Sequence, residues 1–273
     1  MEAWDKHGKL ITYLRELGDA AVAFSGGVDS TYLLAACKEA LGEKTLALSA
    51  VTPLQPAWER RDACELAGRL GVKHQRVDLD VLDRDAVASN PADRCYHCKK
   101  AIFSRLWEEA RKAGFSHLLD GGNVDDLSDY RPGRQAVREL AVFSPLEAVG
   151  MSKEEIRANS KRLNLPTWDR PAFACLASRI PYGTALTREN LEQVERAEAY
   201  FFKKGFSNVR VRHHGTIARI EVDPGDRRRF FNEQFLDETG AYLKSLGFKY
   251  GALDLLGYRM GSLNSALAKE ERS

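Results

Sequence analysis

AVAFSGGVDST, residues 21–31, joins a short apolar run to a helical pattern through a glycine-rich turn. Two adjacent glycines allow positive φ angles and close backbone approach, so successive N–H groups can point into one hollow. The helix that follows adds the positive end of its dipole, and serine hydroxyls add further donors. The stretch is typical of a phosphate-binding loop, whose expected binding residues are Ser25, Gly26, Gly27, Asp29 and Ser30.

This loop contains an aspartate but no lysine. A carboxylate beside phosphates is repulsive unless a cation lies between them, and Mg²⁺ suits that position because it takes carboxylates together with phosphate oxygens. The missing lysine argues against a Walker-type loop, which grips the β- and γ-phosphates. We therefore expect Asp29 to bind Mg²⁺ while the loop holds a departing pyrophosphate. Asp126, in LDGGNVDD (119–126), is a second candidate magnesium ligand.

Strands and helices alternate through the first part of the chain. Apolar residues recur there at strand or helix spacing, with glycine or proline near the ends of the segments. This order predicts an α/β fold with a parallel sheet covered on both faces, and ligands at the carboxyl ends of its strands. The expected strands are 20–24, 45–51, 74–80 and 117–122, and the expected helices are 2–17, 30–40, 56–71, 99–113 and 152–163.

The later part of the chain has a different texture. DYRPGRQAVREL (129–140) lacks a clean period and reads as a long functional loop, and 166–184 reads as a linker or a site loop. A helix-strand-strand-helix-strand order then predicts a smaller α+β region. We place an α/β domain at residues 1–165 and an α+β domain at residues 166–273. The later elements are expected at 187–204, 208–214, 216–222, 224–246 and 251–256.

The bulk composition is that of an ordinary globular protein. The chain has 273 residues and a formal net charge of +2, which does not indicate broad capture of nucleic acid. No apolar run approaches the roughly 18 residues that a membrane span needs. The first residues also lack the apolar stretch of a secretory signal. We expect a cytoplasmic protein with no membrane partner.

Three cysteines are candidates for chemistry. Cys95 and Cys98 form a C-x-x-C pair whose sulfurs face the same way on a helix, and Cys175 lies in the irregular segment FACLASRIPYG (173–183). Three interpretations are open: a structural zinc site, a redox pair or direct sulfur chemistry, and a [4Fe–4S] cluster held by three thiolates. Structural zinc usually takes four ligands and clusters normally use four cysteines, so the spacing does not choose the metal.

A second anion site is expected in NVRVRHH (208–214). Arg210 and Arg212 alternate with valines, which on a strand places both guanidinium groups on one face. Paired guanidinium groups suit a nucleotide phosphate, and Ser178 and Arg179 are candidates to join them. The alternative is a solvent-exposed sheet face that carries surface ion pairs, which are common and weak.

Several motifs together resemble the LarE sulfurtransferases of the PP-loop ATP pyrophosphatase superfamily. The resemblance implies an adenine nucleotide alpha hydrolase-like PP-loop fold that uses ATP and Mg²⁺. It implies an enzyme that adenylates a carboxylate of pyridinium-3,5-biscarboxylic acid mononucleotide, releases pyrophosphate and replaces AMP with sulfur. The thiocarboxylate product serves synthesis of the nickel-pincer nucleotide cofactor. The motifs are SGGVDST, LDGGNVDD, DYRPG, SPL (144–146), CLASRIPYGT and VRVRHHGTIARIE.

The resemblance also implies roles for individual residues. It places the substrate phosphate on Ser178, Arg210 and Arg212, and a functional acid at Glu198. In one branch of the family a cysteine that matches Cys175 surrenders its own sulfur. In the other branch three cysteines hold a [4Fe–4S] cluster that carries an extra sulfide. The three cysteines of this chain (Cys95, Cys98 and Cys175) resemble the second type.

Three hypotheses follow from these observations. The first is the small-molecule sulfurtransferase, with sulfide or another sulfur donor as partner and a homo-oligomeric assembly implied by the family. The second is a PP-loop tRNA thiolation enzyme, for which the near-neutral charge supplies no broad basic surface. The third is a nucleotide-binding regulator that performs no chemistry.

Overall fold

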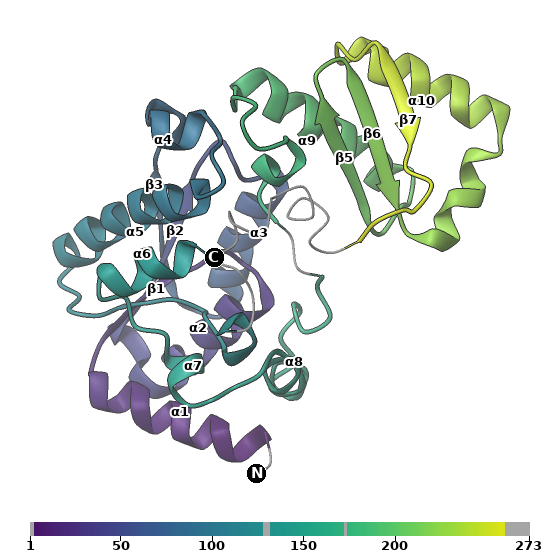
Figure 1. Ribbon diagram of the computed structural model, residues 1–273. Helices are drawn as coiled ribbons and strands as arrows, with labels where there is room; N and C mark the ends of the chain where they lie inside the picture. The colour runs from purple at the N-terminus through teal and green to yellow at the C-terminus, as the bar shows by residue number, and fades with distance from the viewer. Residues whose placement is uncertain (1–2, 128–131, 172–173, 260–273) are drawn as a thin grey trace. The chain divides into compact units, whose positions relative to one another are not determined.

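The computed structural model describes residues 3–127, 132–171 and 174–259 (Figure 1). Its contacts divide the chain into two compact units. The first unit comprises Met1–Val81 and Asp93–Phe173, and the second comprises Leu82–Ala92 and Ala174–Ser273. None of the helices within the described ranges is both long and apolar enough to cross a membrane.

The first unit contains a four-stranded sheet in the order β3-β2-β1-β4. Every pairing in it is parallel, with Ala20 opposite Thr45 and Ala21 opposite Leu118. The predicted parallel sheet is thereby confirmed, because the alternation of strands and helices forces each connection to cross over a sheet face. The strands are β1 (Ala20–Ala23), β2 (Thr45–Val51), β3 (Lys73–Asp78) and β4 (Leu118–Leu119).

Helices cover both faces of this sheet. Val22 and Ala47 pack into a core with the helices on one face of the sheet, whereas the neighbouring Ala21 and Leu46 pack into a second core with the helices on the other face. Successive strand residues point to opposite faces, which explains why adjacent residues enter different cores. One face packs on α1 (Ala3–Leu17), α2 (Val28–Leu41), α3 (Ala57–Arg69) and α8 (Lys153–Arg162), and the other on α5 (Arg94–Lys112) and α6 (Gly133–Glu139).

The predicted long loop at 129–140 is wrong over its second half, where α6 forms. A Cβ on Gly133 would lie 2.6 Å from Lys99 Cδ and 3.2 Å from the Cys95 carbonyl oxygen, so a glycine is needed for this close approach to α5. Trp107 Nε1 donates to the Leu140 carbonyl at 2.9 Å. A seven-residue helix is too short to show a clear period, and packing on α5 stabilises it. Residues 128–131, which include part of DYRPG, lie outside the described residues.

The second unit contains a three-stranded sheet in the order β5-β6-β7 (Figure 1). The first pair is antiparallel and the second is parallel, and the predicted helix-strand-strand-helix-strand order is confirmed. Val209 and Val211 pack with Phe201 in the core beneath the helices. The elements are α9 (Arg188–Lys203), β5 (Val209–His214), β6 (Ile217–Val222), a 3₁₀ segment (Pro224–Phe230), α10 (Glu233–Ser245) and β7 (Tyr250–Leu253).

A short excursion of the chain, which includes α4 (Asp85–Ala88), belongs to the second unit. Asn90 is fully buried with a φ of 58°, and its side-chain amide donates to the carbonyls of Pro181 and Thr184 at 2.8 and 3.0 Å. Its own carbonyl accepts from the Gly183 N–H at 2.9 Å. These bonds fasten the Pro-Tyr-Gly turn. The division into domains at residue 165 stays a prediction.

Candidate functional site

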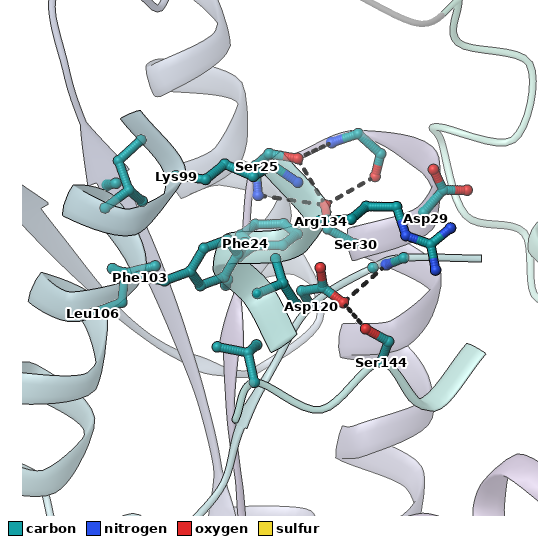
Figure 2. Close-up of a pocket in the computed structure, with 18 of the residues that line it drawn as sticks. Phe24, Ser25, Asp29, Ser30, Lys99, Phe103, Leu106, Asp120, Arg134 and Ser144 are labelled. Atoms are coloured by element: carbon teal, nitrogen blue, oxygen red, sulfur yellow. Dashed lines mark hydrogen bonds between the residues drawn. The ribbon is translucent and has the colours of Figure 1, made fainter. Parts of the chain in front are cut away.

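The predicted phosphate loop lies at the carboxyl end of β1 and leads directly into α2 (Figure 2). Gly27 caps the helix and has no side chain that could occupy the first amides of α2. Ser30 Oγ donates to the Gly27 carbonyl at 3.2 Å and lies 3.1 Å from Ser25 Oγ. The two hydroxyls hold the turn in shape at the positive end of the helix dipole.

Gly26 has a φ of +75°, and a Cβ at this position would lie 3.3 Å from Ala63 Cα. We expect Gly26→Ala to lower the free energy of unfolding by about 1–2 kcal/mol, because a left-handed conformation is costly for alanine. The matched control is Gly68→Ala in α3, where a Cβ meets nothing within 4 Å. That variant should gain up to about 1 kcal/mol, since alanine favours helix over glycine. Urea denaturation measures both, and equal stability of the two variants would contradict this loop conformation.

A cavity of about 380 Å³ opens between the loop, the sheet and α5. One end is apolar and is lined by Phe24, Phe103 and Leu106; Figure 2 shows Phe103 and Leu106 on the side of the cavity away from Asp29. The other end is polar and includes Asp29 and Ser30. An apolar region that leads to a phosphate loop suits the polarity of a nucleotide, with the base in the apolar region and the phosphates on the loop.

The LDGG turn after β4 closes the polar end of this cavity. A Cβ on Gly121 would lie 3.1 Å from the Ser30 nitrogen and 3.2 Å from Asp29 Cβ, so the two turns are in close contact. Asp120 Oδ1 accepts from Ser144 Oγ at 2.6 Å and from the Gly122 N–H at 3.1 Å. Adjacent parallel strands end at one sheet edge, which is why two turns far apart in sequence meet here.

Lys153 is a site residue that sequence reasoning missed. It is the first residue of α8, and its Nζ forms a short ion pair with Asp29 Oδ2. The phosphate loop itself contains no lysine, but the fold places Lys153 next to it. The helix predicted at 152–163 is confirmed, and Ser152 and Glu155 form a capping box at its start. No local pattern, however, pairs a lysine with an aspartate 124 residues away.

The carboxylate of Asp29 lies in a mixed electrostatic environment. Burial raises its pKa, and the negative charge of Asp126 raises it further, whereas Lys153 lowers it; the net direction is upward. Oδ1 of Asp29 is buried with no hydrogen-bond partner among the residues described here. Asp29 and Asp126 line the same cavity, and a magnesium ion needs only one or two protein carboxylates beside phosphate oxygens. These two residues therefore fit Mg²⁺.

A second cavity, of about 200 Å³, lies against the same loop. Lys153 and Arg170 line it together with the loop residues from Ser25 to Asp29. Arg170 donates to the Gly26 carbonyl at 3.3 Å and to Asp62 Oδ2 at 2.9 Å. Arg157 in turn donates to the Arg170 carbonyl at 2.7 Å. Part of the irregular segment 166–184 is therefore held at the phosphate loop.

The three candidate cysteines are divided between the units. Cys95 and Cys98 lie in the first two turns of α5, which begins five residues before the predicted start at residue 99. Arg94, which is 2% exposed, places Nη2 3.8 Å from Cys95 Sγ. Cys175 precedes the 3₁₀ turn Leu176–Arg179 of the second unit. Within the described ranges, no three or more Cys, His, Asp or Glu side chains form a group that would hold a metal ion.

Buried ion pairs organise the second unit. Arg179 and Glu198 are 2% and 4% exposed and form a bidentate pair with distances of 2.9 and 3.0 Å. Glu198 Oε1 also accepts from the Val211 N–H at 3.0 Å, which ties α9 to β5. Arg179 Nη1 donates to Ser178 Oγ at 2.9 Å and to the Cys175 carbonyl at 3.0 Å. The conformation around Cys175 is thereby set by one arginine.

The expected arginine pair of β5 is also buried. Arg212 binds Glu221 through two hydrogen bonds of 3.0 and 2.8 Å and donates to the Ser178 carbonyl at 2.7 Å. Burial lowers the pKa of Arg210, and the nearby positive charge of Arg179 lowers it further. The alternative of a solvent-exposed sheet face is wrong, because Arg210 and Arg212 are 3% and 7% exposed. Arg179 and Arg212 lie near enough to Arg210 to act on its charge, so three guanidinium groups gather here, an arrangement that suits an anion.

Two of the known proteins to which this chain is similar match it over nearly its full length. A profile described as NAD synthase matches residues 9–104. An uncharacterized protein of Synechocystis is 40% identical over 94% of this chain and 96% of its own length. The pyridinium-3,5-bisthiocarboxylic acid mononucleotide synthase of Lactiplantibacillus plantarum is 39% identical over 97% of this chain and 96% of its own. A tRNA-specific 2-thiouridylase of Trichlorobacter lovleyi is 27% identical over 50% of this chain and 43% of its own.

Proposed function

This chain belongs to the LarE family, with the pyridinium-3,5-bisthiocarboxylic acid mononucleotide synthases, and from this membership we propose that it is an ATP-dependent sulfurtransferase acting on pyridinium-3,5-biscarboxylic acid mononucleotide. The observation that carries the proposal is a match that runs through both the phosphate loop and the buried arginine cluster of the second unit. Similarity to a tRNA thiolation enzyme extends over only half of the chain.

The reaction begins at a carboxylate, which is a poor electrophile. A carboxylate oxygen of the substrate forms a bond to the α-phosphorus of ATP, and the bond from that phosphorus to the β-phosphate oxygen breaks. The amides and hydroxyls of the loop, from Ser25 to Ser30, hold the departing pyrophosphate. Mg²⁺, held by Asp29 and Asp126, would neutralise the phosphate charges. Sulfur then bonds to the acyl carbon, and AMP leaves with the electron pair.

The substrate phosphate is assigned to the second unit. Ser178, Arg210 and Arg212 would bind it, since buried guanidinium groups suit a phosphate dianion. Arg179 positions Glu198 through the bidentate pair, so the acid has a single orientation. The support for this assignment is the gathering of three buried guanidinium groups, those of Arg179, Arg210 and Arg212, together with the family membership.

The decisive experiment identifies the nucleotide products. Purified protein with Mg·ATP and the biscarboxylic mononucleotide should yield AMP and pyrophosphate in equal amounts, measured by ³¹P NMR and chromatography. Nicotinamide mononucleotide, which lacks the ring carboxylates, serves as the control and should yield neither product. Formation of ADP and orthophosphate would contradict the proposal. AMP formation that requires tRNA would favour the thiolation enzyme.

For the sulfur step we propose that Cys95, Cys98 and Cys175 act together. A [4Fe–4S] cluster is the first alternative and zinc is the second. Among the described residues no three or more Cys, His, Asp or Glu side chains form a group that would hold a metal ion, so the support is family membership and the C-x-x-C at the start of α5. The sulfur donor, sulfide or another carrier, and a homo-oligomeric state are proposed on the resemblance alone.

Metal analysis tests the assignment of these cysteines. After anaerobic purification we expect iron and acid-labile sulfide in equal amounts, with visible absorption, because thiolates bind iron–sulfur clusters. Cys98→Ser should lose both, and Cys64→Ser, which changes an exposed cysteine of α3, should lose neither. Zinc without iron in the anaerobically prepared protein would contradict the cluster.

A further inference from the structure

The ion pair between Lys153 and Asp29 joins the two cavities at the phosphate loop. Asp29 lines both the larger and the smaller cavity, whereas Lys153 lines only the smaller one. The side chain of Lys153 is 31% exposed and that of Asp29 is 23% exposed, so a ligand in solution can reach both partners. The pair therefore lies where the nucleotide cavity meets a second cavity that contains cationic groups.

The phosphates of a bound nucleotide would change the electrostatic interactions of this ion pair. Oδ2 of Asp29 is paired with Lys153. The other carboxylate oxygen, Oδ1, is buried and has no hydrogen-bond partner in the described part of the chain. A divalent cation on this carboxylate would repel the ammonium group at short range. Phosphate oxygens in the smaller cavity would attract the same ammonium group, together with Arg170. A cation on Asp29 and phosphates in the smaller cavity would thus both favour movement of the Lys153 ammonium group from Asp29 to the phosphates.

We propose that Lys153 exchanges partners during the reaction: it pairs with Asp29 in the free enzyme and binds the pyrophosphate end of ATP when Mg²⁺ takes Asp29. The smaller cavity then holds the pyrophosphate, with Arg170 as its second cation. This inference rests on the proposed function, because it assigns the position of that reaction's leaving group. Lys153 supplies the positive charge that the loop sequence lacks.

The backbone of Lys153 is held firmly while its side chain is long and flexible. Its N–H donates to Asp125 Oδ2 at 2.6 Å, within the acidic turn beside the loop. Lys6 binds the Gly150 carbonyl and Glu155 Oε2, both at 2.7 Å, which holds the first turn of α8 from outside. A fixed backbone with a four-carbon stem allows the ammonium group to change partners without movement of the helix.

Binding of two simple probes tests the exchange. We compare Mg²⁺ alone and Mg·pyrophosphate by calorimetry on the full-length wild type, Lys153→Met and Lys153→Arg. Lys153→Met should bind Mg·pyrophosphate roughly tenfold or more weakly, because one charge-assisted contact is lost. The same variant should bind Mg²⁺ alone several-fold more tightly, since no ammonium group competes for Asp29. Lys153→Arg, which retains the charge, should restore most of the Mg·pyrophosphate affinity.

Opposite changes for the two probes separate this role from simple damage to the fold. Lys161→Met is the matched control, because Lys161 is an exposed lysine of the same helix that lies over the Trp168 ring. It should leave both affinities unchanged. The inference is overturned if Lys153→Met keeps its Mg·pyrophosphate affinity, if it binds both probes more weakly, or if the wild type does not bind Mg·pyrophosphate. Wild type that binds the probe but forms no AMP would instead contradict the proposed function.

Discussion

Asp29→Asn should slow AMP formation by roughly 10²–10³-fold, the loss typical of removing one preorganised charge-stabilising group from an active site. The carboxylate is shared by both cavities and pairs with Lys153. Asparagine keeps the shape of the side chain but cannot neutralise a metal ion or the lysine. The rate with saturating substrate and Mg·ATP measures the effect. A variant that retains more than a tenth of the wild-type rate would show that this carboxylate is not part of the reaction.

The same variant should not be less stable than wild type. Burial raises the pKa of Asp29, so the folded state favours the protonated form and the ionised form costs stability above that pKa. Asparagine removes this cost, and we expect an equal or higher thermal midpoint at neutral pH. In wild type, activity should fall as the pH decreases through the raised pKa of Asp29, because the carboxylate becomes protonated. Loss of activity with a lower midpoint would point to misfolding instead.

Glu198→Ala should lower the free energy of unfolding by about 3–5 kcal/mol, the usual cost of leaving one charge of a buried pair uncompensated. Arg179 would lose two hydrogen bonds at a site that is 2% exposed. The Val211 N–H would lose its acceptor as well, in the strand that carries Arg210 and Arg212. Urea denaturation, followed by a probe in the second unit, measures the loss.

Two further variants show how a loss of stability in Glu198→Ala should be interpreted. Glu198→Gln keeps an acceptor for the Val211 N–H and loses only the charge, so it should be less destabilised than Glu198→Ala. Glu238→Ala removes an exposed partner of Lys204 in the same unit and should not change stability measurably. If Glu198→Ala were as stable as Glu238→Ala, the ion pair would not organise this unit.

Much of the fold could be predicted because it depends on local patterns. Periods of two and 3.6 residues, with glycine and proline at the ends, identified the strands of the parallel sheet and the order of the second unit. The start of helix α8 could be predicted because the two partners of its capping box, Ser152 and Glu155, lie only three residues apart. Helix α6 could not be predicted, because seven residues show no clear period and the contact of Gly133 with α5 is not local in sequence.

The site divides in the same way. The sequence by itself determined a phosphate loop after β1, two acidic candidates for a cation, and an arginine pair on one face of a strand, because each is a short-range pattern. Only the tertiary structure brought Lys153 to Asp29, buried Arg210 and Arg212, and paired Arg179 with Glu198. Those features depend on desolvation and on charges from distant segments meeting in space, and neither quantity is encoded in the spacing of residues along the chain.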